Sequence, residues 1–372
     1  MSQVPMRMNY VGERLADAAR AERTADPGFG GVFTEHMVTT RWAPRREWHD
    51  LVLGPHQDLS VSPALSGLHY GQSVFEGLKA YRMRGDRVGV FRPEAHARRF
   101  QRSARRMLMP EPPKELFVDA VTELVRADLD WVPDNDDVSL YLRPILFGED
   151  ASLSVRASES YRLVVIACVV AGIFGRSPRP LRVWVSEDEA RAAHGGAGGA
   201  KAAGNYAPTF RQQELARAHG CDQVLWLDPR GRGQIEELGA MNVFLVRAGS
   251  RPTLVTPSLS GSLLPGVTRD SVLSMAASLD LAVAEEQITL NQWSAGCRDA
   301  TITEAFACGT AASIVPIGEV VTGGTTWTVG DGRPGPVTEA LARTLSGIQR
   351  GALPDPHGWM REVAPRSVGA LA

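Results

Sequence analysis

The chain has 372 residues, enough for two domains, and its hydrophobic content of 44% and charged content of 22% are ordinary for a globular protein. A formal net charge of −2 argues against nucleic acid or an anionic membrane as the main partner. The 4 cysteines contain no CxxC pair and the 8 histidines no metal-binding cluster, which argues against a disulfide framework and a metal site.

The first part of the chain predicts an arm followed by a small α+β domain, residues 31–173. Residues 1–30 lack the apolar stretch of a signal peptide and are expected to form a loosely packed arm. The strand-like runs RVGVFR and VSLYLRPILFG follow, with helices predicted between them at Pro93–Met107 and Lys114–Leu129. The longest apolar run, Leu163–Phe174, is shorter than the about 20 residues that span a bilayer, so we expect a buried strand and a cytoplasmic protein.

Glycine, serine and proline interrupt this pattern at 174–186, which predicts a linker or lid. Residues 187–372 are then expected to form a larger α/β domain. Its predicted strands include CDQVLWLD, NVFLVRA, PTLVTP and DLAVAEEQIT, and a helix is expected from about Thr268 to Leu279.

Lysine is rare in this chain, because Lys79, Lys114 and Lys201 are the only lysines among 40 basic residues. Unlike arginine, lysine can lose its proton and act as a nucleophile. Lys114 lies among charges at a helix start, and Lys79 is compatible with a structural role. Lys201 stands in HGGAGGAKAAGNYAPTF, where small residues surround a single amine, so it is the candidate functional lysine.

This glycine-rich segment admits three interpretations. A P-loop requires Ser or Thr after its GK pair to hold magnesium, and here alanines flank the lysine, so a P-loop is rejected. A flexible surface loop explains the glycines but not the lysine. A lysine that forms a Schiff base with pyridoxal phosphate explains both, because small neighbours let the cofactor ring approach the backbone.

The third interpretation makes further demands that the sequence can meet. Glu236 and Glu237 precede a strand, and alternation sends only one of them inward to pair with the pyridine nitrogen. In LPGVTRDSVL, Thr268 is suited to cap a helix whose first amides could bind phosphate. FACGTAASIVP offers a further hydroxyl, that of Thr310.

In this order, the motifs resemble those of the branched-chain amino acid aminotransferases, in the longer form of that family. The resemblance covers about residues 30–362 and rests on GLHYGQSVFEGLKAYR, FRPEAHARRF, YLRPILFGED, KAAGNYAP, IEELGAMNVF, LSGSLLPGVTRDS and EAFACGTAA. It implies an α/β (α+β), two-domain, fold-type-IV structure like that of D-amino acid aminotransferase, with the active site between the domains.

The resemblance also implies how pyridoxal 5'-phosphate would be held. Lys201 would form the Schiff base and shuttle the proton, and Tyr206 would hydrogen-bond the phenolic oxygen of the cofactor. Glu237 would pair with the pyridine nitrogen, which leaves Glu236 outside the site. The residues implied for the phosphate are Arg99, Val267, Thr268 and Thr310.

The substrates implied are leucine, isoleucine or valine on one side and 2-oxoglutarate or glutamate on the other, in a ping-pong mechanism. Alternation puts Tyr141 and Arg143 on one strand face, and the resemblance implies that they bind the γ-carboxylate. The other implied substrate residues are Phe33, Tyr70, Phe75, Thr310 and Ala311, together with Leu153 and Val155, which would reach in from the second subunit of a homodimer.

The chain departs from the family pattern at Ala203, Ala240 and Ile173, and the two departures in the pocket and the lid concern the substrate. They leave open a paralogue of specialised metabolism with a different amino acid substrate. D-amino acid transaminase and aminodeoxychorismate lyase, which share the fold, are alternatives from within the enzyme class. A cofactor-binding protein without turnover is the alternative from outside it.

Overall fold

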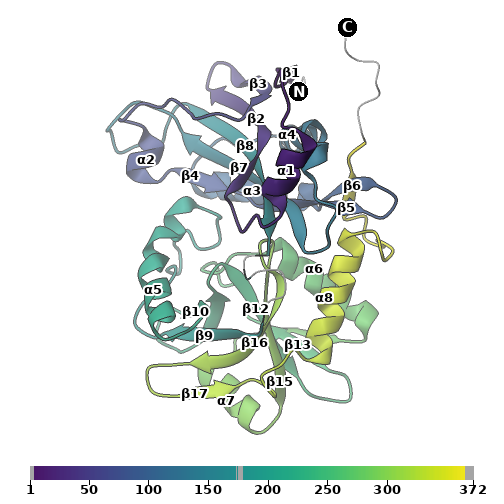
Figure 1. Ribbon diagram of the computed structural model, residues 1–372. Coiled ribbons are helices and arrows are strands. Elements are labelled where there is room, and N and C mark those ends of the chain that lie inside the picture. The colour runs from purple at the N-terminus through teal and green to yellow at the C-terminus, as the bar shows by residue number, and fades with distance from the viewer. Residues whose placement is uncertain (1–3, 173, 175–178, 365–372) are drawn as a thin grey trace. The chain divides into compact units, whose positions relative to one another are not determined.

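The computed structural model describes residues 4–172, 174 and 179–364. The chain folds into two structural units. The first unit comprises Met1–Arg176, Ala200–Gly204 and Gly347–Ala372, and the second comprises Ser177–Gly199 and Asn205–Ser346. Each unit contains one large sheet (Figure 1).

The sheet of the first unit is antiparallel except for the parallel pair of β1 and β3. Its strand order is β1 (Arg7–Met8), β3 (Glu47–Pro55), β2 (Val32–Ala43), β8 (Tyr161–Ala171), β7 (Val138–Gly148), β5 (Leu78–Met83), β6 (Arg87–Phe91) and β18 (Met360–Glu362), with β4 (Ser73–Phe75) paired to β7. The predicted strands RVGVFR and VSLYLRPILFG are therefore confirmed as β6 and β7. The apolar run that begins at Leu163 is confirmed as part of β8, which lies between β2 and β7 in the sheet and is almost wholly buried.

Two helices, α3 (Pro93–Arg106) and α4 (Lys114–Ala127), pack on this unit, and both predicted helices are confirmed. Proline occupies the first turn of α3, where its missing N–H costs no hydrogen bond. The rings of Phe100 and Phe117 join the two helices, with centroids 5.3 Å apart. A short helix, α2 (Ser66–Tyr70), ends at Gly71, whose φ is 63°.

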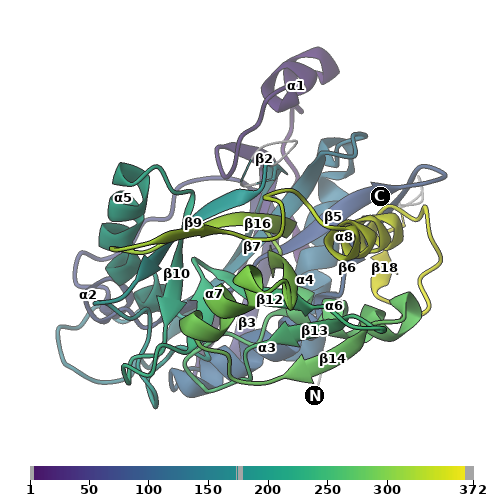
Figure 2. The same cartoon turned by 90° about the horizontal axis from the view of Figure 1, so that it is seen from below.

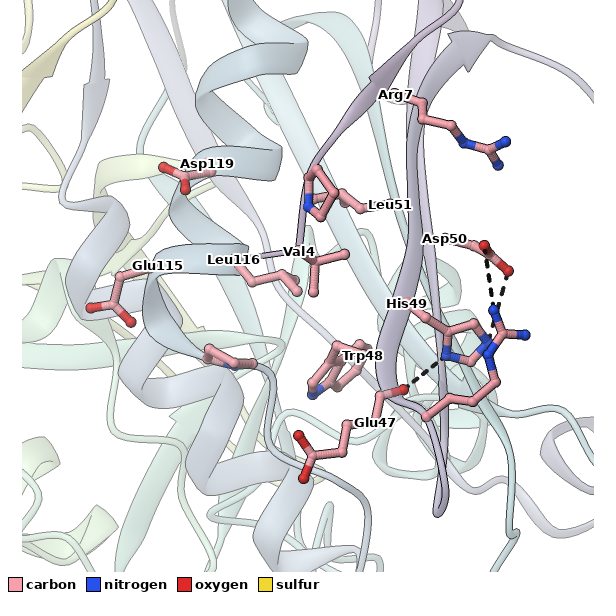
Figure 3. Close-up of a pocket in the computed structure, with 13 residues that line it drawn as sticks. Val4, Arg7, Glu47, Trp48, His49, Asp50, Leu51, Glu115, Leu116 and Asp119 are labelled. Carbon is pink, nitrogen blue, oxygen red and sulfur yellow. Dashed lines mark hydrogen bonds and ion pairs between the residues drawn. The ribbon is translucent and has the colours of Figure 1, made fainter. Parts of the chain in front are cut away.

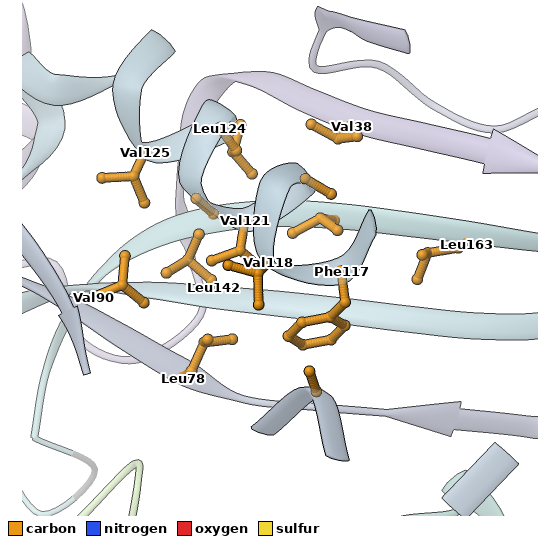
Figure 4. Close-up of a cluster of buried hydrophobic side chains, with 14 of the residues drawn as sticks. Val38, Leu78, Val90, Phe117, Val118, Val121, Leu124, Val125, Leu142 and Leu163 are labelled. Carbon is orange, nitrogen blue, oxygen red and sulfur yellow. The ribbon is translucent and has the colours of Figure 1, made fainter. Parts of the chain in front are cut away.

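The helical spacing of apolar residues in α4 puts one face of that helix into the core. Each fully buried Leu, Val or Phe side chain in such a core contributes about 1.5–3 kcal/mol. Figure 4 shows this α4 face meeting side chains from several strands of the sheet. The α4 residues are Phe117, Val118, Val121, Leu124 and Val125, and the strand residues are Val38, Leu78, Val90, Leu142 and Leu163.

The N-terminal arm is packed more closely than the sequence predicts. Besides the β1–β3 pairing, the Val11 N–H donates to His36 Nε2, and the Leu15 N–H donates to a Glu35 carboxylate oxygen. His36 is in turn held by Asp128 through Nδ1, at 2.6 Å. The polar composition of the arm hid these contacts, because they are made by backbone amides. Helix α1 (Asp17–Thr24) fits the expectation of loose packing, since it has no buried residue.

The second unit is built on a ring of six strands. The order is β11 (Ile235–Leu238), β10 (Gln223–Leu227), β9 (Leu181–Ser186), β16 (Ser313–Val321), β15 (Ile302–Gly309) and β12 (Met241–Arg247), and β12 pairs again with β11. Figure 2 shows β9 beside β16. Three further strands extend the ring, namely β13 (Thr253–Thr256), β14 (Ala282–Glu285) and β17 (Thr326–Thr328).

The helices of this part of the chain are α5 (Phe210–Ala218), α6 (Val267–Met275), α7 (Leu290–Arg298) and α8 (Pro336–Gln349). Thr289 and Gln292 form a capping box at the start of α7, in which each side chain bonds the other residue's backbone N–H. The predicted helix at 268–279 corresponds to α6 followed by a 3-10 turn, Ala276–Leu279.

Three segments lie differently from the predicted domain division. Leu181–Ser186, assigned to the linker, is strand β9, because Leu181, Val183 and Val185 alternate into the core. Ala200–Gly204 and residues 347–364 belong to the first unit. The rest of the predicted linker is only partly described, and Ile173 lies outside the described residues.

No helix within the described residues is long and apolar enough to cross a membrane. The same residues contain no group of three or more His, Cys, Asp or Glu side chains arranged to hold a metal ion.

Candidate functional site

The backbone of Lys201 is fixed on both sides by the first unit. The Lys201 N–H donates to Ser103 Oγ of α3 at 2.9 Å, and its C=O accepts from the Phe75 N–H at 3.0 Å. The next residue, Ala202, forms an isolated bridge with Val74. These contacts fix the Cα–Cβ direction of the lysine, while its side chain remains half-buried.

The small residues beside Lys201 have a packing cause. Ala200 and Ala202 are 3% and 1% exposed and belong to the core cluster of the first unit, so larger side chains would have to displace that core. The Lys201 Nζ lies 4.7 Å from the centre of the Phe75 ring. The segment therefore presents one amine over an aromatic face, with its flanking residues buried.

Lys79, another lysine of this unit, is a buried amine. It lies on β5 opposite Tyr141 of β7 and is 7% exposed. Burial, aided by the charge of Arg350, lowers the pKa of Lys79 to about 8. Lys79 therefore has to be considered beside Lys201 in any test of the reactive amine.

Arg99 is buried in an ion-pair network that the sequence did not predict. Its Nε and Nη2 donate to the two carboxylate oxygens of Glu76, at 2.6 and 2.8 Å. His96 Nδ1 lies 2.8 Å from Glu76 Oε2, and the Gly77 N–H donates to the same oxygen. The spacing of His96 and Arg99 along one helix face could have suggested a shared partner, but Glu76 is 20 residues or more away in the chain.

The electrostatics of this network keep Glu76 ionised. Burial by itself raises the pKa of Glu76, but the charge and hydrogen bonds of Arg99, with those of His96, outweigh it and hold the pKa well below its usual range. Burial lowers the pKa of His96, whose Nδ1 lies within hydrogen-bond distance of the Glu76 carboxylate. The network thus fixes the guanidinium of Arg99 by one edge.

Three predicted substrate residues of the first unit lie together. Arg143 Nη2 donates to the Tyr141 hydroxyl at 3.0 Å, as the alternation along β7 predicts. The Arg143 guanidinium also lies 4.8 Å from the centre of the Phe75 ring. Its Nε is buried and has no hydrogen-bond partner among the described residues. The group therefore offers a cation, a phenol and an aromatic face.

Gly77 makes room for the Tyr141 ring. A Cβ built at Gly77 would lie 1.9 Å from the Tyr141 hydroxyl oxygen and 2.6 Å from its ring carbon Cζ, so any side chain there must displace the phenol. The β5 strand that follows Gly77 pairs with β7, which brings the glycine against the tyrosine.

We expect Gly77→Ala to lower kcat/KM for amino acid substrates by roughly tenfold to a hundredfold, because a small displacement of a positioning group has effects of that size. Steady-state kinetics with purified protein measure this effect. Gly12→Ala is the matched control, since a Cβ at Gly12 meets nothing within 4 Å. Equal kinetics for the two variants would contradict the positioning role of Tyr141.

The remaining predicted residues of the first unit lie nearer to solvent. Phe33 stacks on His56, with ring centroids 5.1 Å apart. The Tyr70 hydroxyl donates to the Leu153 carbonyl oxygen. Leu153 and Val155 are 63% and 87% exposed in the single chain, which is unusual for two aliphatic side chains so close in sequence.

In the second unit, both adjacent acids of β11 are buried, on opposite faces of the strand. Glu237 is 2% exposed, and its Oε1 accepts from the Leu264 N–H and from Arg191 Nη2. Glu236 is 5% exposed and accepts from the hydroxyls of Ser260 and Ser262. Burial raises the pKa of Glu236. The alternation of side chains along the strand correctly predicts that the two acids lie on opposite faces. Glu236, however, is buried rather than exposed to solvent.

The turn before α6 is organised by Asn242, which the sequence did not single out. Asn242 pairs with Glu237 of β11 and Cys308 of β15, and its Nδ2 donates to the Leu264 carbonyl. A Cβ at Gly266 would lie 2.1 Å from Asn242 Oδ1, so this position requires glycine. The strand pairings thus bring Glu237 and the turn before α6 together.

The prediction that Thr268 caps this helix is wrong. Gly266 is the N-cap of α6, with no capping side chain, and Thr268 is the second residue of the helix. A side chain at Gly266 would collide with Asn242 Oδ1, so the N-cap position itself has no room for Ser or Thr. Val267 and Thr268 nevertheless lie in the first turn, where backbone N–H groups favour anions.

The last three predicted residues of the second unit lie in turns. Tyr206 is half-buried, and its carbonyl accepts from the N–H and the hydroxyl of Thr209. Thr310 and Ala311 form the turn between β15 and β16. They are half-buried and follow closely after Cys308, the residue that pairs with Asn242.

A groove in the first unit, with a volume of about 1000 Å³, lies apart from these residues (Figure 3). It is lined by the start of the chain, β3 and the first half of α4, and it includes Trp48, Leu51 and Leu116. None of its lining residues is a predicted site residue. Its lining contains no lysine, so it lacks the amine on which the chemistry above depends.

Comparisons with known proteins agree with this chemistry. Residues 73–320 match the family described as amino-transferase class IV. A probable branched-chain-amino-acid aminotransferase of Streptomyces coelicolor is 46% identical over 351 residues, 94% of this chain and 96% of that protein. The branched-chain-amino-acid aminotransferase of Mycolicibacterium smegmatis is 45% identical over 346 residues, 92% of this chain and 94% of that protein.

A solved structure is similar as well. The branched-chain aminotransferase of the thermophilic archaeon Thermoproteus uzoniensis, solved with norvaline, has a TM-score of 0.69 and 28% identity, over 88% of this chain and 100% of that one. The predicted fold-type-IV fold is confirmed by this similarity and by the family match. With its amine, buried carboxylates and glycine-capped helix on that fold, the chain belongs to the class IV aminotransferase family.

Proposed function

We propose that this protein is a pyridoxal-phosphate-dependent branched-chain amino acid aminotransferase. It moves the amino group between leucine, isoleucine or valine and 2-oxoglutarate, in two half-reactions at one site. The observation that carries the proposal is the fixing of Lys201, whose backbone is bonded to Ser103 and Phe75 while its Nζ remains over an aromatic face. The family and the relatives at 45% and 46% identity support it.

The residues present fit the cofactor by their chemistry. Lys201 would hold its carbonyl carbon through Nζ, and the buried carboxylate of Glu237 would pair with its pyridine nitrogen. Gly266 provides no capping side chain at the start of α6, so the first backbone N–H groups of that helix suit the oxygens of a phosphate group. Arg99, with its guanidinium fixed by Glu76, would add a cation for the same phosphate. Tyr206 and Thr310 would donate their hydroxyls.

When bound, the cofactor supplies an electron-withdrawing ring that stabilises negative charge at the substrate Cα. The protein performs the remaining tasks. Once the substrate amine has displaced it from the cofactor, Lys201 would be a free amine and would take the proton from the substrate Cα, because a neutral amine is a general base of suitable strength. In the reverse half-reaction it would deliver a proton to Cα. Glu237 stabilises positive charge at the pyridine nitrogen, and Arg99 maintains the orientation of the phosphate end.

Substrate recognition is assigned to the group formed by Phe75, Tyr141 and Arg143. The buried Nε of Arg143 has no partner among the described residues, so it suits the γ-carboxylate of glutamate. The Tyr141 hydroxyl adds a second polar contact. The rings of Phe75 and Phe33 suit a branched aliphatic side chain, and Tyr70, Thr310 and Ala311 complete the proposed set.

We also propose a cytoplasmic homodimer. The high exposure of Leu153 and Val155, next to the Tyr70 hydroxyl that bonds Leu153, supports a role for this loop in the site of a second subunit. A D-amino acid transaminase or a lyase of the same fold is the alternative, and the configuration of the accepted donor separates them.

The direct test is the visible absorption spectrum of the purified protein. We expect a yellow band that bleaches on addition of L-leucine, is unchanged by D-leucine and returns with 2-oxoglutarate. A band indifferent to L-leucine would retain the cofactor but exclude this substrate. Absence of a band after added pyridoxal phosphate would overturn the proposed function.

A further inference from the structure

Arg191 stands at the centre of a buried cluster in the second unit. Its Nη2 donates to Glu237 Oε1 at 3.1 Å, to the Ser262 carbonyl at 2.5 Å and to the Gly198 carbonyl at 3.3 Å. The side chains of Arg191 and Glu237 are 7% and 3% exposed. An arginine so buried is retained only where its charge is paired and its donors are used.

The cluster ties three separate segments to one carboxylate. Gly198 belongs to the glycine-rich run before Lys201, Ser262 precedes the turn into α6, and Glu237 lies on β11. A Cβ at Gly198 would lie 2.0 Å from the Ser262 carbonyl oxygen, so the two backbones meet directly. Ser262 is also held by its hydroxyl, which donates to Glu236. Arg191 therefore lies where all three segments meet.

The contacts on Glu237 are directional. Both the Arg191 guanidinium and the Leu264 N–H donate to the same oxygen, Oε1. Two donors on one oxygen set the plane of the carboxylate. A charged donor also favours the ionised form of a buried acid, which burial alone would disfavour.

We propose that Arg191 is a positioning residue for the transamination reaction, which orients Glu237 and keeps it as a carboxylate that leaves the proton on the pyridine nitrogen of the cofactor. This inference rests on the proposed function. The inference goes beyond the proposed function because Arg191 acts through Glu237 rather than by touching the cofactor or the substrate.

The direction of the effect follows from where one proton lies. The Glu237 carboxylate and the pyridine nitrogen compete for this proton, and the nearby guanidinium lowers the proton affinity of the carboxylate. Without Arg191 the acid gains proton affinity, so the proton moves from nitrogen toward the carboxylate. The neutral pyridine withdraws electrons less well, and proton removal from the substrate Cα slows.

The test is Arg191→Gln, read by the ¹⁵N chemical shift of the pyridine nitrogen in protein reconstituted with ¹⁵N-labelled pyridoxal phosphate at one fixed pH. We expect the signal to move from the protonated toward the unprotonated position. We also expect kcat to fall roughly tenfold to a hundredfold, the range for loss of one charged hydrogen bond. Arg191→Lys keeps the charge and should restore part of the ¹⁵N shift.

Arg182→Gln is the matched control, because Arg182 also bonds a glutamate, Glu319, and a backbone carbonyl, that of His219, in the same unit. It should leave the ¹⁵N signal unchanged. A wild-type ¹⁵N signal in Arg191→Gln would overturn the inference, even if that variant is less stable.

A second measurement remains decisive if Arg191→Gln folds poorly. In the Glu237→Gln background, Arg191→Lys should lower kcat no further, since coupled residues are not additive. Additive losses would overturn the inference. A wild-type protein that takes up no pyridoxal phosphate and shows no transaminase activity after the cofactor is added would instead overturn the proposed function itself.

Discussion

Lys201→Ala is expected to lower transaminase activity by more than about a thousandfold, because no other group would replace the amine that bonds the cofactor and moves the Cα proton. The variant should fold normally. Both hydrogen bonds that fix this residue use its backbone, and the substitution removes the contact of the amine with the Phe75 ring. Activity is measured with L-leucine and 2-oxoglutarate, and folding by thermal unfolding.

Lys114→Ala is the control, because Lys114 is partly exposed and pairs with the adjacent Glu115 at the surface. Added methylamine should restore part of the activity of Lys201→Ala, since it supplies a small external base. If Lys201→Ala remained fully active, Lys201 would not be the reactive amine. Lys79, whose pKa burial lowers to about 8, would then be the candidate.

Glu76→Gln is expected to destabilise the first unit by about 3–5 kcal/mol, the cost of leaving one partner of a buried ion pair without the other. The variant retains the shape of the side chain but removes the charge that holds Arg99. The affinity for pyridoxal phosphate should fall as well, because the guanidinium is no longer fixed by its Nε and Nη2. Thermal unfolding without cofactor measures the first effect, and cofactor titration the second.

Glu111→Gln provides a close control. Glu111 accepts the same two-bond fork from Arg105, with both distances 2.7 Å, but Arg105 is exposed. This variant should unfold at the wild-type temperature and bind the cofactor normally. Equal stability and equal cofactor affinity of the two variants would show that the Glu76 ion pair contributes no more than an exposed ion pair does.

The Glu76 effect should also depend on pH, with a definite sign. The folded state holds the pKa of Glu76 below its ordinary value of 4.5. The stability that this carboxylate contributes is therefore fully present above about pH 4.5 and is lost as the pH falls toward the folded pKa. The stability difference between wild type and Glu76→Gln should shrink in that acidic range, as thermal unfolding at a series of pH values would measure.

Local patterns in the sequence were sufficient to predict most elements and to select a candidate reactive residue. The helical spacing in α4, the proline that opens α3 and the apolar runs of β7 and β8 each follow from the periodicity of side chains. The amine in a run of small residues singled out Lys201, and a few ordered motifs were specific enough to indicate the family. Such signals are readable because each lies within a short stretch of chain.

Only the tertiary structure decided which groups surround these residues. Glu76 reaches Arg99, Arg191 reaches Glu237, and Asn242 selects Gly266 as the cap of α6. The partners in these pairs are 23 or more residues apart. Side-chain periodicity carries no information on which buried charge meets which. That choice is made when the sheets pair and the core excludes water, because every buried charge must then find a partner.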